Sequence, residues 1–126
     1  MSERVIASRY ALENKIGDGG MATVWVALDR LLQRRVALKL LQQNRQSRTP
    51  ARFEQEARMV AQLQDAGVVQ VFDYGTDQGE PFVVMELLAG EDLETRLSRV
   101  ERLPLQAVTT LISQVARGLE VAHLAN

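Results

Sequence analysis

The 126-residue sequence contains no cysteine and a single histidine, His123. The absence of cysteine excludes disulfides, thiolate nucleophiles and cysteine-ligated metal, and one histidine cannot build a metal site from histidines alone. Neither sign of charge is in excess, because 15 basic and 16 acidic side chains leave a formal net charge of −1. The sequence therefore gives no electrostatic reason to expect a nucleic acid or an anionic membrane surface as a partner.

Long hydrophobic runs are also missing from the sequence. The N-terminus lacks the apolar stretch of a signal peptide, and no stretch further along is long enough to span a bilayer. These absences predict a cytoplasmic chain with no membrane segment, while a parent protein could still carry an anchor after Asn126. What is present, 46% apolar and 25% charged residues, is typical of one folded domain of this length.

Apolar periodicity predicts strands in the first part of the chain and helices at its end. Strands are expected over 9–16, 23–28, 36–41, 68–72 and 81–85. Helices are expected over 51–64, over 92–98 and from Pro104 onward. We therefore predict an α+β fold, in which a five-stranded antiparallel sheet with one packed helix is followed by two further helices.

A glycine cluster, Gly17-Asp18-Gly19-Gly20, separates the first two expected strands. Without Cβ atoms the backbone can approach a ligand closely, and its N–H groups can point at phosphate oxygens. A tight hairpin turn is the plain alternative for such a cluster. The cluster opens a strand rather than a helix, and no Lys-Ser or Lys-Thr pair follows it, so the dinucleotide-binding and P-loop motifs do not fit. The sequence favours a glycine-rich hairpin that lies over phosphates.

Lys39 interrupts an otherwise apolar strand. An unpaired charge among buried residues is costly, so two interpretations remain open. The lysine lies either on the solvent face of the strand or toward a cleft, where it would hold phosphates and pair with a carboxylate. Glu56 is the candidate partner because it shares a helical face with Val60 and Leu63, whereas Glu54 lies nearer the outer face.

Six segments, taken in order, carry a resemblance to a known family. They are Ile16-Gly17-Asp18-Gly19-Gly20-Met21-Ala22-Thr23-Val24, Ala27-Leu28-Asp29, Val36-Ala37-Leu38-Lys39, Arg52-Phe53-Glu54-Gln55-Glu56-Ala57, the run 84–90 and the run 118–123. Together they resemble the N-terminal lobe and hinge of a bacterial eukaryote-like (Hanks-type) Ser/Thr protein kinase. The resemblance implies an N-terminal extension over 1–9, a kinase N-lobe and hinge over 10–88, and the start of a truncated C-lobe over 89–126.

The resemblance also implies an ATP site. Lys39 would bind the α- and β-phosphates with Glu56 as its helix partner, and these two are the implied catalytic residues. Val24 and Ala37 would enclose the adenine ring, and Met85 would close the back of its pocket. The other implied nucleotide contacts are Ile16, Gly17, Asp18, Gly19, Gly20, Met21 and Ala22 in the hairpin, the backbone of Glu86 and Leu88, and Asp92 near the ribose.

Two features depart from the family pattern. Ala22 stands where a third glycine is usual, and it is tolerated only if this residue does not need a positive φ. The catalytic loop and the magnesium-binding Asp-Phe-Gly do not occur in the 126 residues. We therefore expect the ligands of Mg²⁺ to lie outside this chain, and we expect no phosphoryl transfer by the chain alone.

Three classes of function remain open. The leading hypothesis is the ATP-binding portion of an enzyme that transfers the γ-phosphate of ATP to Ser or Thr of a protein substrate held by the missing C-lobe. The second is a non-catalytic kinase-like module that binds nucleotide or a partner kinase, and here the resemblance allows a homodimer formed back to back. The third is an interaction domain that does not depend on nucleotide.

Overall fold

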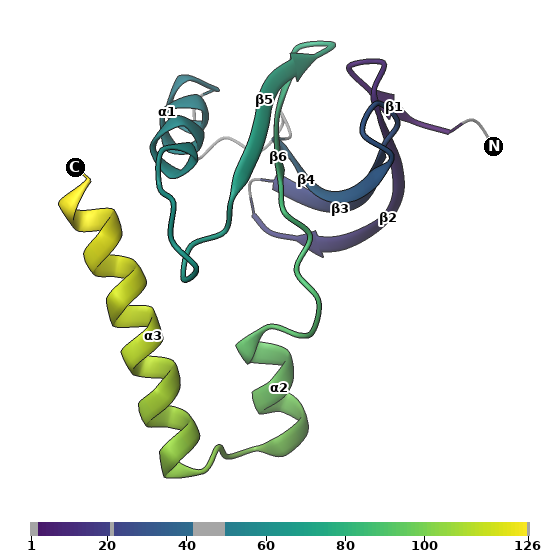
Figure 1. Ribbon diagram of the computed structural model, residues 1–126. Coiled ribbons are helices and arrows are strands. Elements are labelled where there is room, and N and C mark those ends of the chain that lie inside the picture. Colours follow the sequence, from purple (N-terminus) through teal and green to yellow (C-terminus); the bar gives the residue numbers. More distant parts are fainter. Residues whose placement is uncertain (1–2, 21, 42–49, 126) are drawn as a thin grey trace.

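The computed structural model describes residues 3–20, 22–41 and 50–125. A curved antiparallel sheet with one helix beside it forms the upper body in Figure 1, and two further helices lie below. The strands are β1 (Val5–Ile6), β2 (Tyr10–Asp18), β3 (Ala22–Asp29), β4 (Arg34–Leu41), β5 (Val71–Asp77) and β6 (Glu80–Met85). The helices are α1 (Pro50–Ala61), α2 (Leu93–Val100) and α3 (Leu105–Leu124). The predicted α+β class is confirmed.

Within the described residues the sheet has six strands rather than the predicted five, in the order β1-β2-β3-β4-β6-β5. The additional strand is β1, whose two residues pair with Tyr10 and Ala11 of β2. Two residues are too few to show an apolar period, which is why the sequence pattern did not indicate this strand. The first three predicted strands form the expected meander, because β2 pairs with β3 and β3 with β4 in antiparallel register.

One strand lies further along the chain than predicted. The apolar run 68–72 indicated a strand, but β5 covers Val71–Asp77. The N–H of Val68 donates instead to the carbonyl of Asp65 at 3.1 Å, in the turn after α1, and Val69 lines a cavity beside that helix. An apolar run shows that residues are buried, but it does not show whether they pair in a sheet or pack against a helix.

The helix ends follow local hydrogen bonds. Helix α1 ends at Ala61, earlier than predicted, because the N–H groups of Gln62 and Leu63 bond to carbonyls three residues back and so tighten the last turn. Helix α2 begins directly after Asp92, whose side chain accepts a hydrogen bond from the N–H of Thr95 at 2.7 Å. Asp92 is therefore the N-cap of α2.

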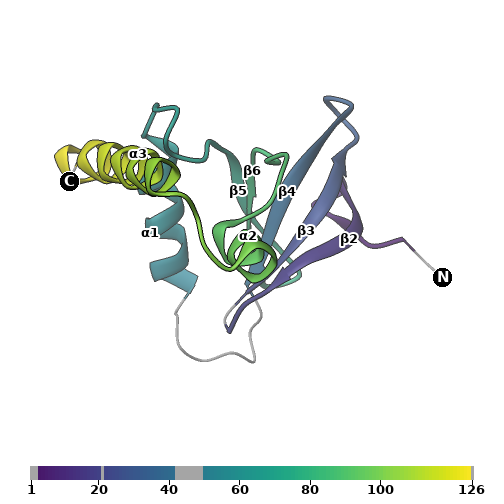
Figure 2. The same cartoon turned by 90° about the horizontal axis from the view of Figure 1, so that it is seen from below.

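Successive side chains along the strands point to opposite faces of the sheet, and each face carries a hydrophobic cluster. The core cluster contains Ile6, Tyr10, Leu12, Ala27, Val36, Leu38, Leu40, Phe82 and Val84. The helix-side cluster contains Leu41, Phe53, Ala57 and Val83 and lies between the sheet and α1, which occupies one side of the sheet in Figure 2. Because Leu38 and Leu40 enter the core cluster, Lys39 between them faces α1.

The N-terminal residues connect the two outermost strands of the sheet. The N–H of Ala7 donates to Asp77 Oδ1 at 3.0 Å, and the hydroxyl of Tyr10 donates to Asp73 Oδ2 at 2.6 Å. Burial and the Asp73 carboxylate raise the pKa of Tyr10, which keeps its hydroxyl protonated as a donor. These bonds join β1 and β2 to β5 and hold the curvature of the sheet that is visible in Figure 1.

A partly buried ion pair organises the turn between β3 and β4. Arg9 donates to both carboxylate oxygens of Asp29 at 2.9 Å. The N–H groups of Leu31 and Leu32 donate to Asp29 Oδ1 at 3.0 and 3.2 Å. The hydrogen bond from Arg9 is the main cause that lowers the pKa of Asp29 to about 2, and the backbone donors add to it while burial opposes them. One carboxylate therefore fixes both the turn and the start of β2.

Candidate functional site

Lys39 lies in the middle of a row of side chains that crosses three strands. Val24 on β3 pairs with Lys39 on β4, and Lys39 pairs with Val83 on β6. In the neighbouring row, Ala37 pairs with Met85. Because directly paired residues share a face of the sheet, all five side chains lie on the face that carries α1. The register of the sheet thus brings together residues that the sequence assigned to one site.

The glycine hairpin and Lys39 enclose an open cavity of about 270 Å³, called here the front cavity. Its lining contains Gly17, Asp18, Gly19, Gly20, Ala22, Val24, Lys39, Leu41 and Phe53. The volume lies near the lower end of the range for small-molecule sites. Most of the predicted hairpin contacts therefore surround one space with the lysine. Met21, which belongs to the same prediction, lies outside the described residues.

The hairpin has the backbone of a tight turn. The N–H of Gly19 donates to the carbonyl of Ala22 at 3.0 Å, and Asp18 pairs with Thr23. An ion pair of 3.3 Å joins the Asp18 carboxylate to Lys15, which offsets a negative charge at the edge of the cavity. Ala22 is a buried strand residue opposite Leu41 and does not have a positive φ, so alanine fits the position of the usual third glycine.

A second space, the rear cavity of about 180 Å³, lies between the sheet and α1. Its lining contains Lys39, Phe53, Glu56, Ala57, Val60, Val69, Val71, Val83 and Met85. Lys39 and Glu56 thus border one largely apolar space. Apart from these two charged residues, the lining is apolar, so the walls offer few partners for a polar group.

The two candidate carboxylates of α1 point in different directions. Glu54 pairs with Arg58 at 2.6 Å and does not line the rear cavity within the described residues, although its side chain is about as exposed as that of Glu56. Glu56 lines the rear cavity, and its Oε1 lies 3.9 Å from Arg52 Nε. The ammonium of Lys39 lies over the ring of Phe53, 5.9 Å from the ring centroid. A direct Lys39–Glu56 pair in the nucleotide-bound protein stays a prediction.

The remaining predicted residues lie around these cavities or away from them. Ile16 and Leu88 are exposed side chains next to the hairpin and after β6, respectively. The N–H of Glu86 donates to the carbonyl of Gln70 at 2.9 Å, and its side chain accepts from the N–H of Gln70 at 3.0 Å. Glu86 is therefore tied to Gln70, in the loop before β5, through both its backbone N–H and its side-chain carboxylate.

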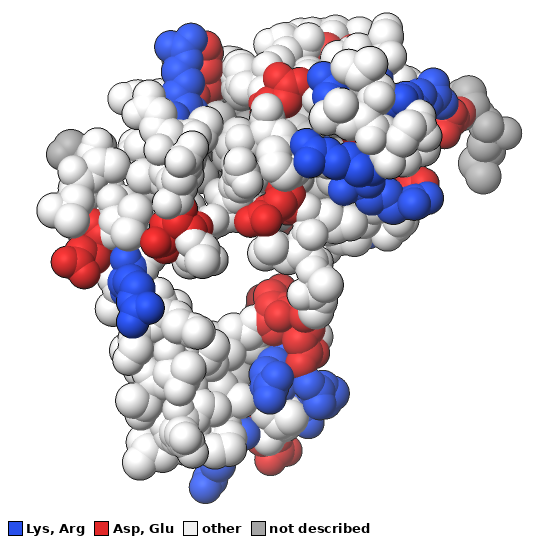
Figure 3. Space-filling view, viewed as in Figure 1, with Lys and Arg blue, Asp and Glu red and all other residues white. Residues whose placement is uncertain are grey.

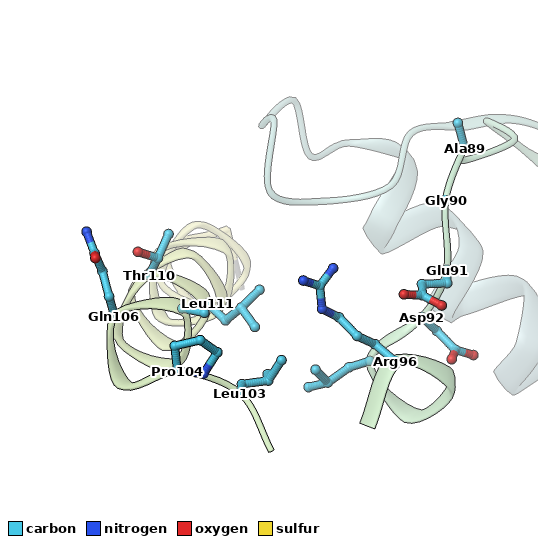
Figure 4. A pocket seen from close by; sticks show the side chains of 12 residues that line it. Ala89, Gly90, Glu91, Asp92, Arg96, Leu103, Pro104, Gln106, Thr110 and Leu111 are labelled. Carbon is cyan, nitrogen blue, oxygen red and sulfur yellow. The ribbon is translucent and has the colours of Figure 1, made fainter. Parts of the chain in front are cut away.

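Asp92 lies apart from Lys39, in a larger hollow of about 1060 Å³ between α2 and α3. Figure 4 shows Glu91 and Asp92 at the start of α2, with Arg96 pointing from α2 toward Leu111 on α3. Figure 3 shows an opening between the sheet and the two C-terminal helices, with acidic side chains on its rim. The hydrogen bonds from Thr95 lower the pKa of Asp92, which favours its role as a charged helix cap.

A comparison with known protein families identifies the family of this chain. The family model for the protein kinase domain matches residues 10–126, nearly the whole chain. The chain belongs to the protein kinase family. Within this kinase chain, the hairpin and Lys39 line one cavity, and their binding of phosphate stays a prediction.

Individual relatives agree with the family assignment. The kinase chain is 42% identical over 135 residues to the serine/threonine-protein kinase PknA of Mycobacterium tuberculosis and 38% identical over 127 residues to PknL of the same species. Both alignments cover 99% of this chain but only 31% and 32% of the relatives, so the chain spans about a third of their length. The crystal structure of the M. tuberculosis PknI kinase domain superposes with a TM-score of 0.82 at 24% identity, covering 98% of this chain and 51% of that domain. This last likeness shows a shared fold.

Phe53 is a residue of the kinase site that the sequence reasoning did not select. Its position three residues before Glu56 places both on one helical face, and this spacing was the available signal. A separate signal concerns Lys39 itself: lysine occurs at only two positions of the sequence, Lys15 and Lys39, while arginine supplies the other basic side chains apart from His123. The interior strand of this kinase therefore carries one of the two lysines in the chain.

The described residues of this kinase chain form no metal centre and no membrane-spanning helix. No group of three or more His, Cys, Asp or Glu side chains there could hold a metal ion. No helix in that part combines the length and the apolar character needed to cross a bilayer.

Proposed function

We propose that this chain is the ATP-binding portion of a Ser/Thr protein kinase. The observation that carries the proposal is the position of Lys39, which borders both the cavity under the glycine hairpin and the cavity that holds Glu56. One lysine ammonium in a partly desolvated site is a strong point charge for phosphate oxygens. The glycine backbone limits the height of the space above it.

Each residue of the site has a role in this proposal. Lys39 binds the α- and β-phosphates, and Glu56 orients its ammonium from the rear cavity. Val24 and Ala37 lie on the same face of the sheet, so they contact the adenine ring from one side and do not enclose it as the resemblance implied, and Met85 closes the back. Glu86 offers its carbonyl to the adenine edge because its N–H is already bonded to Gln70. Leu88 supplies the next backbone contact, and Asp92 faces the ribose side.

The proposal predicts that ATP protects Lys39 from chemical modification. An amine-reactive acylating reagent is applied to the 126-residue chain, and digestion with mass spectrometry gives the rate at each lysine. At an ATP concentration of about ten times its Kd, the Lys39 rate should fall about tenfold, because protection follows the occupied fraction. Lys15 is the internal control, since it is exposed and does not line the front cavity within the described residues. Equal rates at Lys39 with and without ATP would reject the proposed site.

We further propose that these 126 residues do not transfer phosphate by themselves. Phosphoryl transfer needs an oriented nucleophile and metal ions that bridge the β- and γ-phosphates. The chain contributes Lys39 and Glu56 but no catalytic-loop aspartate and no Asp-Phe-Gly. With radiolabelled ATP, Mg²⁺ and a generic protein substrate, phosphate incorporation should equal that of the Lys39→Ala variant. Incorporation above that background would contradict this expectation without affecting the nucleotide site.

A further inference from the structure

Phe53 separates the two cavities of the candidate site. Within the described residues, Lys39 and Phe53 are the side chains that line both the front and the rear cavity. All other lining residues belong to one cavity only. The lysine and the aromatic ring therefore form the wall between the space under the glycine hairpin and the space beside Glu56.

The ring of Phe53 is held firmly in this position. Its residue is 4% exposed and belongs to the helix-side cluster with Leu41, Ala57 and Val83. Its ring centroid also lies 6.2 Å from that of Tyr74, with the two planes tilted by 45°. Although the ring borders both cavities, its burial in this cluster makes a displacement costly, because leaving the cluster would expose apolar surface. It is a fixed surface against which a flexible side chain can rest.

The ammonium of Lys39 rests against this surface, since Lys39 Nζ lies 5.9 Å from the ring centroid. The face of an aromatic ring carries negative potential and attracts a cation at this range. A lysine side chain has a long flexible stem, so without the ring its ammonium would be distributed between the two cavities. A cation that is already held at the wall loses less conformational entropy when it meets an anionic ligand.

We propose that Phe53 is a positioning residue for the phosphate-binding lysine. Its ring holds the Lys39 ammonium at the wall of the front cavity, where it is presented to the polyphosphate of a nucleotide under the glycine hairpin. This inference rests on the proposed ATP-binding function. In addition to the proposed pairing with Glu56, the Lys39 ammonium is held by a contact with the Phe53 ring. The strength of this contact depends on the electron density of the ring as well as on packing.

The test changes the electrons of the ring while it preserves its shape. Progressively fluorinated phenylalanines are introduced at position 53 of the 126-residue chain, and the Kd for ATP is measured by calorimetry. We expect Kd to rise with each added fluorine, reaching about fivefold for the most electron-poor ring, because a cation–π contact of this kind has about that effect on an equilibrium. Fluorination at Phe82, in the core cluster on the other face, is the matched control and should leave Kd unchanged.

A second measurement keeps the inference testable if fluorinated chains fold poorly. Phe53→Leu is combined with Lys39→Ala, and the thermal midpoint of each variant confirms that it is folded. Phe53→Leu should weaken ATP binding about fivefold when Lys39 is present and should have no effect when Lys39 is absent. A merely structural ring would weaken binding equally in both backgrounds.

The outcomes separate this inference from the proposed function. If ATP binds and Lys39→Ala weakens it, but ring fluorination leaves Kd unchanged and Phe53→Leu acts equally in both backgrounds, Phe53 does not position the lysine and the ATP site stands. If the unmodified chain binds no ATP, the proposed function and the positioning role are both overturned. A graded rise of Kd that disappears in the Lys39→Ala background supports both.

Discussion

Replacing Lys39 with Ala should weaken ATP binding by roughly 10- to 100-fold. The loss corresponds to the charge-assisted hydrogen bonds between an ammonium and phosphate oxygens, which contribute about 1.5–3 kcal/mol each. The site enhances this contribution, because Lys39 is flanked by Val24 and Val83 and borders a cavity with an apolar lining. Lys39→Met keeps most of the aliphatic stem and should lose nearly as much affinity, which separates charge from packing.

The matched control for this prediction is Lys15→Ala. Lys15 lies on β2 next to the hairpin, where its ammonium pairs with Asp18, but it does not line either cavity within the described residues. Calorimetric titration with ATP should give a Kd less than about fivefold higher than that of the unmodified chain, because the variant loses only an exposed ion pair and leaves the Asp18 charge screened by water. Trp25, the single tryptophan, offers a fluorescence check that each variant is folded. Similar losses for both lysine variants would mean that ATP responds to overall charge and would exclude a specific role of Lys39.

Replacing Asp29 with Ala should lower the free energy of unfolding by about 3 kcal/mol, because it leaves four donors without their acceptor. These donors are two guanidinium N–H groups of Arg9 and the backbone N–H groups of Leu31 and Leu32. Asp29 is 1% exposed, so water cannot easily take its place. Urea unfolding followed by Trp25 fluorescence measures the change. Glu13→Ala, which removes an exposed pair with Arg35, is the control and should cost far less.

The same carboxylate should make the fold sensitive to acid in a defined range. The pKa of Asp29 is about 2 in the folded chain against an ordinary value of 3.8, so the folded state favours the ionised form. The resulting stabilisation is complete above about pH 4 and is lost as the pH falls toward 2. Urea unfolding at a series of pH values should therefore show a steeper decline for the unmodified chain than for Asp29→Asn. Equal slopes would show that this carboxylate titrates normally in the folded protein.

Much of the site could be predicted because its signals are local. The cluster from Gly17 to Gly20 indicates the hairpin. The alternation along β4 showed that Lys39 lies on the face opposite Leu38 and Leu40, although the sequence left open whether that face meets solvent or a cleft. The helical spacing of Glu56 with Val60 also pointed to the sheet, and both line the rear cavity. In each case a period of two or of 3.6 residues fixes which side of an element a residue occupies.

Other features could not be predicted because they depend on contacts between distant segments. Strand β1 has two residues and is held by bonds such as Ala7 N–H to Asp77, which no local period encodes. The shift of β5 followed from the packing of Val68 and Val69 beside helices rather than in the sheet. In the sequence, Phe53 is indistinguishable from other apolar helix residues, and only the tertiary structure shows that its ring contacts the Lys39 ammonium.

The sequence by itself determined the α+β class, the glycine hairpin and the helical carboxylate, because side-chain periodicity and glycine content act within a few residues, but it left open which face of its strand Lys39 occupies. Only the tertiary structure decided that the hairpin, Lys39 and Glu56 border two adjoining cavities with Phe53 as their common wall. The register of β3, β4 and β6 and the packing of α1 set that arrangement. The physical reason is that burial of apolar surface between elements far apart in the chain, not local preference, fixes their relative positions.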